Sequence, residues 1–263
     1  MTGYRIPGPI CFSSQGGSLL DGTLALTRTP LPGSMCTSLD AYTDLVLAPP
    51  TITAQTLGFL FTTCRNPIQG LGDEDYLAAA NELQVEVAAI KAVAEVETSG
   101  QAFDPDGRPR ILYERHYFHR LTRGKYSKKH PDISNPSAGG YGKFSAQYGK
   151  LERAFKLDAE AALKSASWGR FQIMGLNHLA AGHPTVAEFV LAMTRAESEH
   201  LKAFTAFIKS NPALLKALRD KRWAAFAAGY NGRKYKDNNY DTKLANAYGS
   251  FAQPSATATG GKP

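Results

Sequence analysis

Residues 76–97 read YLAAANELQVEVAAIKAVAEVE and predict the helix around which the rest of the chain folds. Apolar side chains recur there at spacings of three and four, which is the period of one helix face. They are Leu83, Val87, Ile90, Val93 and Ala94. Glu97 continues this apolar stripe just before the break at residues 98–100 (TSG), while the other glutamates of the stretch lie off it. The pattern therefore places one carboxylate at a helix end, on the side that faces the core.

That placement predicts a chemical role for Glu97. Burial disfavours the charged form of a carboxyl group and raises its pKa. A glutamate that keeps its proton near neutral pH can act as a general acid. The structural alternative is a satisfied, partly buried glutamate that caps the end of its own helix. Glu97 is therefore the candidate catalytic residue, weighed against a capping role.

Composition limits the class of protein. The chain has 263 residues, of which 43% are hydrophobic, as expected for a globular protein with a real core. It has no apolar run of about 18 residues, so no membrane span is expected. The N-terminus lacks the basic start and apolar core of a signal peptide. Synthesis in the cytoplasm without such a signal is therefore expected.

The net charge of +7 is unevenly distributed. Residues 1–70 contain three cations and three anions, so the whole excess follows residue 70. A basic surface attracts polyanions, which include nucleic acid, anionic lipid and bacterial cell wall, although a generally basic protein would show the same composition. The basic run at residues 125–130 (KYSKKH) is a candidate contact for anionic wall polymer or lipopolysaccharide. Because it lacks a stacking arrangement, no nucleic-acid partner is predicted.

Residues 1–70 differ in composition from the rest. They hold seven of the fifteen prolines and no lysine, glutamate or histidine. Short apolar runs alternate with Pro and Gly breaks, which is typical of short strands and loops. We interpret this segment as a β-rich module, a delivery segment or a leader. It also contains Cys11, Cys36 and Cys64, which fit either one disulfide or three free thiols.

From residue 71 the pattern is helical, which predicts an α+β, mostly α domain over residues 71–252 and a disordered tail at 253–263. Residues 111–118 predict a short strand or a helix start, and residues 123–147 an irregular basic segment. The remaining helices are expected at 151–165, 171–180, 185–210, 214–218, 223–228 and 239–251.

Three separated motifs carry a resemblance to a known family. They are AVAEVETSG at residues 92–100, SASWGRFQIMG at 165–175 and AAGYNG at 227–232. In this order and spacing, the chain resembles the phage-type N-acetylmuramidase domain of endolysins, a member of the lysozyme-like superfamily. The similarity covers residues 71–251, including PDGRPRILYERH at 105–116 and YNGRKYKDNNYDTKL at 230–244. Residues 1–70 fall outside it.

The resemblance implies a function and a fold. Enzymes of this family cut the β-1,4 bond between N-acetylmuramic acid and N-acetylglucosamine in peptidoglycan, without a cofactor or metal. Their fold is mostly helical with a small β element, and Glu97 matches the catalytic acid. A lytic transglycosylase acting on the same bond, or a non-catalytic glycan-binding structural protein, is the alternative.

The resemblance also implies the residues that line a sugar cleft. Gly169 and Gln172 match the cleft, where glycine permits close approach of a ligand and an amide can bind hydroxyl or N-acetyl groups. Ser167 belongs to the same stretch, and Trp168 is either a sugar platform or a core aromatic. For Tyr230 we favour the cleft. For Asn231 we favour a mainly structural role as a helix stop.

A second carboxylate is not assigned. Glu114 is kept as a candidate, with a buried pairing to Arg115 or Arg120 as the alternative. Asp104 and Asp106 fit turn formation. His116 and His119 lack a third ligand at metal spacing, which favours structural roles. Residues 197–200 (ESEH) are interpreted as a solvated helix face.

The expected partner is the glycan strand of peptidoglycan, and a monomer is expected. The protein would act in the periplasm or cell wall, either as a phage lysin after holin-type release or as a toxin delivered by a secretion apparatus. In the second case a cognate inhibitor protein should exist.

Overall fold

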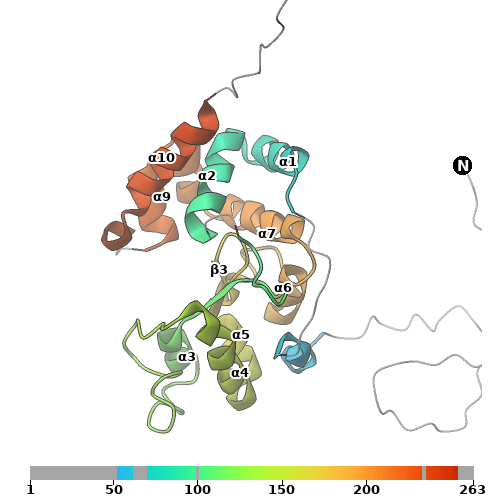
Figure 1. Cartoon of the computed structure of the whole chain (residues 1–263), viewed down its shortest axis with the longest axis vertical. Coiled ribbons are helices and arrows are strands. Elements are labelled where there is room, and N and C mark those ends of the chain that lie inside the picture. The colour runs from blue at the N-terminus through green and yellow to red at the C-terminus, as the bar shows by residue number, and fades with distance from the viewer. Residues whose placement is uncertain (1–51, 62–69, 99–100, 233–234, 254–263) are drawn as a thin grey trace, which may run out of the picture. The chain divides into compact units, whose positions relative to one another are not determined.

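The computed structural model describes residues 52–61, 70–98, 101–232 and 235–253 (Figure 1). All of them belong to one compact unit, residues 50–263, so the boundary predicted at residue 70 falls inside this unit. Helix η2 (Ala54–Phe61) lies before that boundary, and its Leu57 and Leu60 are buried in the core. The predictions for residues 1–49 and for the three cysteines lie outside the described residues.

The described chain is mostly helical, with a small antiparallel sheet, as predicted. The α-helices are α1 (Asp73–Leu83), α2 (Val87–Thr98), α3 (Arg115–Leu121), α4 (Gln147–Leu157), α5 (Ala159–Lys164), α6 (Val186–Met193), α7 (Glu197–Lys209), α8 (Pro212–Arg219), α9 (Trp223–Tyr230) and α10 (Tyr240–Ala252). Short 3-10 helices besides η2 are η3 (Phe144–Ala146), η4 (Gly175–Asn177) and η5 (Tyr235–Asn238). The strands are β1 (Ile111–Tyr113), β2 (Ala166–Trp168) and β3 (Ile173–Met174).

The helix predicted over residues 76–97 is two helices. Gln84 adopts a left-handed conformation with φ 54° and ends α1, and α2 begins at Val87. The apolar spacing continues across the break because both helices bury one face in the same core. A period of three and four residues therefore could not separate one long helix from two consecutive ones. The predicted end of the second helix, beside Glu97, agrees with the structure.

The sheet has the order β1-β2-β3, and both pairings are antiparallel. Ile111 pairs with Trp168 in the first, and Ser167 with Met174 in the second. The two interpretations of residues 111–118 both hold, because strand β1 is followed at once by helix α3. The helix predicted over 171–180 is wrong: its first part forms β3. Gly169 and Gln172 have positive φ values of 70° and 47°, so the chain turns back as a hairpin there.

Two other predicted helices are also divided. The one at 151–165 breaks at Asp158, which adopts an extended conformation and caps α5 by accepting a hydrogen bond from the Ala161 N–H. The one at 185–210 breaks before Ala196, which is extended with φ −163°. Both breaks let the following helix start in a new direction.

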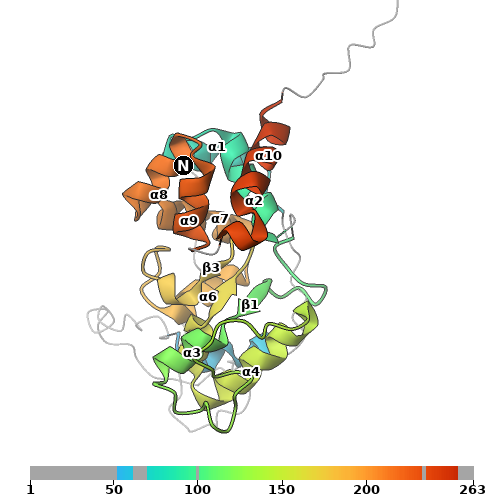
Figure 2. The same cartoon turned by 90° about the vertical axis from the view of Figure 1, so that its left-hand side faces the viewer.

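Figures 1 and 2 show how the elements of this unit are arranged. Helices α1, α2, α9 and α10 lie together at one end, and α3, α4 and α5 lie at the other, with the sheet, α6 and α7 between them. Helix α10 packs against both α2 and α9, which brings residues near 97 and 231 to one place. In the part of the chain that the structure describes, no helix combines the length and the apolar character needed to cross a membrane.

Candidate active site

Glu97 lies at the C-terminal end of α2 and is partly buried. The side-chain amide of Asn231, the residue that caps the end of α9, donates a hydrogen bond of 2.8 Å to the Glu97 Oε1. Among the described residues, Glu97 forms no ion pair. The carboxyl group therefore points neither into bulk solvent nor at a cation.

The environment of Glu97 changes its protonation. Burial raises its pKa from 4.5 to about 7, and the hydrogen bond from Asn231 opposes this rise by stabilising the charged form. Tyr230 and Tyr240 lie close enough that the Glu97 charge adds to burial in raising the pKa of each phenol. A carboxyl group with this pKa is roughly half protonated at neutral pH, which suits a general acid.

Tyr230 joins α9 to the turn at residues 169–172. Its hydroxyl donates a 2.6 Å hydrogen bond to the carbonyl oxygen of Phe171, and its ring stacks on Phe226 at 5.3 Å. The cleft role of Tyr230 stays a prediction. Asn231 ends α9 as predicted, and it also contacts Glu97, which the sequence did not indicate.

The turn between β2 and β3 is held by its own side chains. The amide of Gln172 accepts a 2.8 Å hydrogen bond from the Ser167 hydroxyl and donates to the carbonyl oxygens of Gly169 (2.8 Å) and Arg110 (3.2 Å). The Gly169 N–H also donates to Arg110 O at 2.8 Å. Gln172 and Ser167 thus shape the turn, and their direct contact with a sugar stays a prediction.

Trp168 is a core residue. Its side chain is 1% exposed, and its indole N–H donates to the carbonyl oxygen of Leu163 at 3.1 Å. An indole with both faces covered cannot stack on a sugar, so the platform interpretation is wrong and the core interpretation is correct. Phe171 and Ile173 are also buried, as expected.

Gly169 is buried as well, for a reason that the sequence did not indicate. With φ 70° it lies against the ring of His200, and a Cβ at this position would be 2.7 Å from the His200 Nδ1. The close approach that requires glycine is therefore to a histidine of α7. This corrects the interpretation of Gly169 as a residue that admits a ligand.

His200 belongs to a cluster of buried residues that packs against the turn at residues 169–172. Its Nδ1 accepts the Arg170 N–H at 3.1 Å, and its Nε2 donates to the Met193 carbonyl at 2.7 Å. Burial lowers its pKa to about 4, so the ring is neutral. The Arg170 side chain forms an ion pair of 2.5 Å with Glu197, in which both partners are largely buried.

The solvated face predicted at residues 197–200 is therefore wrong for Glu197 and His200. A signal was available in the spacing, since both residues share the period of a buried stripe on α7 that continues through Leu201, Phe204 and Ile208. Polar side chains on an apolar stripe must find partners inside the protein. Here the partner is the turn at residues 169–172.

Glu114 lies at the other end of β1 from Arg110 and precedes α3. The Tyr141 hydroxyl donates to both of its carboxylate oxygens, at 3.0 and 3.1 Å, and the His116 Nδ1 lies 3.1 Å from Oε2. Burial raises the pKa of Glu114. Its partners are thus a tyrosine and a histidine rather than the predicted arginines. In the described part of the chain, no direct contact joins Glu114 to Glu97.

The remaining polar candidates have structural contacts. Asp104 accepts the N–H groups of Asp106 and Arg108, which is the turn role predicted for it. The His119 Nδ1 lies 2.7 Å from the Ser127 hydroxyl oxygen. The described residues contain no group of three or more histidine, cysteine, aspartate or glutamate side chains suited to a metal ion.

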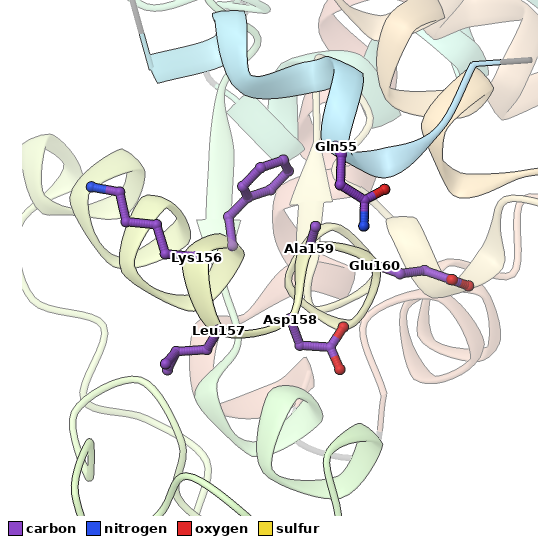
Figure 3. Close-up of a pocket in the computed structure, with 7 residues that line it drawn as sticks. Gln55, Lys156, Leu157, Asp158, Ala159 and Glu160 are labelled. Carbon is purple, nitrogen blue, oxygen red and sulfur yellow. The ribbon is translucent and has the colours of Figure 1, made fainter.

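Figure 3 shows a pocket elsewhere in the molecule. It lies where α4 meets α5, beside η2, and its lining includes Gln55, Lys156 and Glu160. None of the residues that contact Glu97 lines it. The pocket is therefore separate from the candidate active site.

The mostly helical fold with a small antiparallel sheet agrees with the lysozyme-like class of folds that the sequence resemblance implies. Comparison with protein families makes this specific: the N-acetylmuramidase family matches residues 86–252, and the chain belongs to this family. The expected fold and family are thereby confirmed, and the chain is a peptidoglycan hydrolase.

A solved structure gives the same relationship. The crystal structure of the Burkholderia AP3 phage endolysin aligns with a TM-score of 0.65 and 44% sequence identity, covering 73% of this chain and 74% of the endolysin. Comparison with curated proteins finds no match.

Proposed function

We propose that the chain cleaves the β-1,4 bond between N-acetylmuramic acid and N-acetylglucosamine, with Glu97 as the general acid. The observation that carries the proposal is a partly buried carboxyl group whose pKa is raised to about 7 and which has no cationic partner among the described residues. In this role Glu97 donates its proton to the glycosidic oxygen as the bond to the sugar C1 breaks. Proton donation of this kind contributes roughly 10²- to 10⁴-fold in rate.

The fate of the C1 centre distinguishes two reactions. The transition state has oxocarbenium character, and a nucleophile must then reach C1. Attack by water gives a reducing N-acetylmuramic acid end, whereas attack by the 6-hydroxyl of the same sugar closes a 1,6-anhydro ring. We propose hydrolysis, which the family relationship supports. Glu114 is the candidate second carboxylate, and Glu114→Gln tests whether the reaction uses it.

The Glu97→Gln variant tests the catalytic proposal. Glutamine keeps the size of the side chain and can still face Asn231, but it has no acidic proton to donate. We expect solubilisation of purified sacculi to fall by at least about 100-fold, with an unchanged far-UV circular dichroism spectrum. Mass analysis of muropeptides from the native enzyme should show reducing rather than anhydro ends.

The matched control is Glu95→Gln, an exposed glutamate on the same helix. This variant should keep native activity. If Glu97→Gln solubilises sacculi as fast as the native chain, the enzyme uses another acid. If the native chain itself releases no muropeptides, the protein is a non-catalytic glycan-binding protein. Anhydro ends would instead identify a lytic transglycosylase.

We further propose that the protein acts at the cell wall as a monomer. The relationship to a phage endolysin supports holin-type release, and delivery by a secretion apparatus is the alternative. Expression in a bacterial cytoplasm, with and without a co-expressed holin, tests whether holin-type release is sufficient for lysis. Lysis only when the holin is present supports the lysin route. Capture of a cognate inhibitor that blocks sacculus solubilisation supports the toxin route.

A further inference from the structure

Phe144 is a large apolar side chain that is 44% exposed at the start of η3. The other exposed large apolar side chains of the described residues are Leu77, Leu179 and Phe251. A single exposed apolar residue is ordinary on a protein surface. Phe144 differs because of what it contacts.

The contacts of Phe144 lead to the turn beside the active site. The guanidinium of Arg110 lies over the Phe144 ring at 4.4 Å from its centroid. The carbonyl oxygen of the same Arg110 accepts hydrogen bonds from the Gly169 N–H and from the Gln172 amide. The Phe144 ring is thus separated from the turn by one residue.

The same turn is connected to Glu97 on its other side. Tyr230 donates to the Phe171 carbonyl within the turn, and the next residue, Asn231, donates to Glu97. A continuous series of direct contacts therefore runs from the acid, through the turn, to an exposed aromatic ring on a separate element. An enzyme that acts on a polymer gains from binding its substrate away from the bond that it breaks.

We propose that Phe144 is a stacking platform for one pyranose ring of the glycan strand, in a subsite separated from Glu97 by the 169–172 turn. This inference rests on the proposed function. Arg110 occupies one side of the ring, and the exposure of Phe144 leaves surface on which the C–H groups of an N-acetylated sugar can pack. Burying that surface under a sugar is favourable, since apolar area leaves water.

Because Phe144 is exposed, its replacement should leave the fold intact, and the test can separate binding from catalysis. For Phe144→Ala, we expect the KM for release of muropeptides from sacculi to rise roughly three- to tenfold, with kcat changed less than about twofold. Phe144→Trp, which restores an aromatic face, should return KM to near the native value. Thermal unfolding should show that both variants fold.

The control is Phe251→Ala, because Phe251 is 42% exposed on α10, and among the described residues no ring or cation contact joins it to the turn. Its KM should be native. A native KM for Phe144→Ala, or a raised KM that Phe144→Trp does not restore, would overturn the subsite and leave Phe144 with a packing role on Arg110. Either result together with an inactive Glu97→Gln would leave the proposed function standing, whereas an active Glu97→Gln would remove it.

Discussion

At Glu97, two effects act in opposite directions on a single proton. Burial favours the neutral acid, and the Asn231 amide favours the carboxylate. Burial is the larger effect, because the resulting pKa lies well above that of an exposed glutamate. A lysine or arginine in place of Asn231 would favour ionisation much more strongly. An amide therefore orients the carboxyl group without removing its proton.

This raised pKa predicts that Glu97 lowers stability at high pH. The folded-state pKa of about 7 exceeds the unfolded value near 4.5, so the folded chain binds more protons between these values. Stability is therefore unaffected below about pH 4.5 and falls as the pH rises towards 7. The full shift corresponds to about 3 kcal/mol, a ceiling because solvent reaches part of the side chain.

Glu97→Gln should accordingly be more stable than the native chain at about pH 8 and about equally stable at about pH 4. Urea unfolding at both values, followed by circular dichroism, measures the difference. Glu95→Gln should show no such pH-dependent gain, since Glu95 is exposed. An equal gain for Glu97→Gln at both pH values would mean that the carboxyl group is not held neutral by the fold.

Among the elements, the sequence predicted helix ends better than it predicted turns. The end of α2 beside Glu97 followed from the break at residues 98–100 (TSG), and the side on which Glu97 lies followed from apolar spacing, which reports one helix face directly. The reversals at Gln84 and Gln172 did not, because both residues adopt positive φ without being glycine. Gln172 is held there by hydrogen bonds to Ser167 and Arg110, which no local pattern contains.

Contacts between distant parts of the chain also limited the prediction of the candidate active site. The carboxyl position was predictable from one helix, whereas its donor is Asn231, 134 residues away in sequence. The Asn-Gly pair at 231–232 indicated only a helix stop. Trp168 and Gly169 match cleft positions in the motif, but both are buried. Their burial comes from contacts with Leu163 of α5 and His200 of α7, which lie outside the motif.

Alanine substitutions at two glycines measure how closely the chain after β3 packs against α5. A Cβ on Gly175, just after β3, would lie 2.2 Å from the carbonyl oxygen of Leu163 at the end of α5. That atom is backbone and cannot rotate away, so Gly175→Ala should destabilise the chain by at least about 2 kcal/mol. Gly149 lies on the exposed face of α4, where a Cβ meets nothing within 4 Å.

Gly149→Ala is therefore the matched control and should stabilise the chain by about 0.5–1 kcal/mol through helix propensity. Urea unfolding of the two variants gives opposite signs if the contact between β3 and α5 is as close as described. A neutral Gly175→Ala would mean that the end of α5 moves aside at little cost.

Over the whole molecule, one segment that begins with α3 is strongly basic. Residues 115–131 contain six arginines and lysines and no acid. Five of these cations are exposed, and in the described part of the chain none of the five forms an ion pair. They are Arg120, Arg123, Lys125, Lys128 and Lys129. In Figures 1 and 2 this segment, which comprises α3 and the chain just after it, lies at the end of the unit that is opposite to α2 and α9.

We propose that this basic segment draws the enzyme to the carboxylates of the peptide stems in the wall. Unpaired cations on one surface raise the rate of encounter with a polyanion, and salt screens the attraction. Replacing Lys125, Lys128 and Lys129 with glutamine should slow the solubilisation of intact sacculi several-fold at low ionic strength. Between roughly 50 and 300 mM salt, the activity of this triple variant should also fall less steeply than that of the native chain.

The control must separate the effect of where the charge lies from the effect of the total charge. Lys202, Lys209 and Lys216 are exposed lysines that already pair with acids, at 2.7–2.9 Å. Replacing these three with glutamine removes the same net charge from other helices and should change the salt dependence little. Peptide-free glycan strands, which lack the stem carboxylates, should be cut at similar rates by both triple variants and the native chain. Equal losses on sacculi in the two triple variants would show that only net charge matters, and the basic segment would have no specific role.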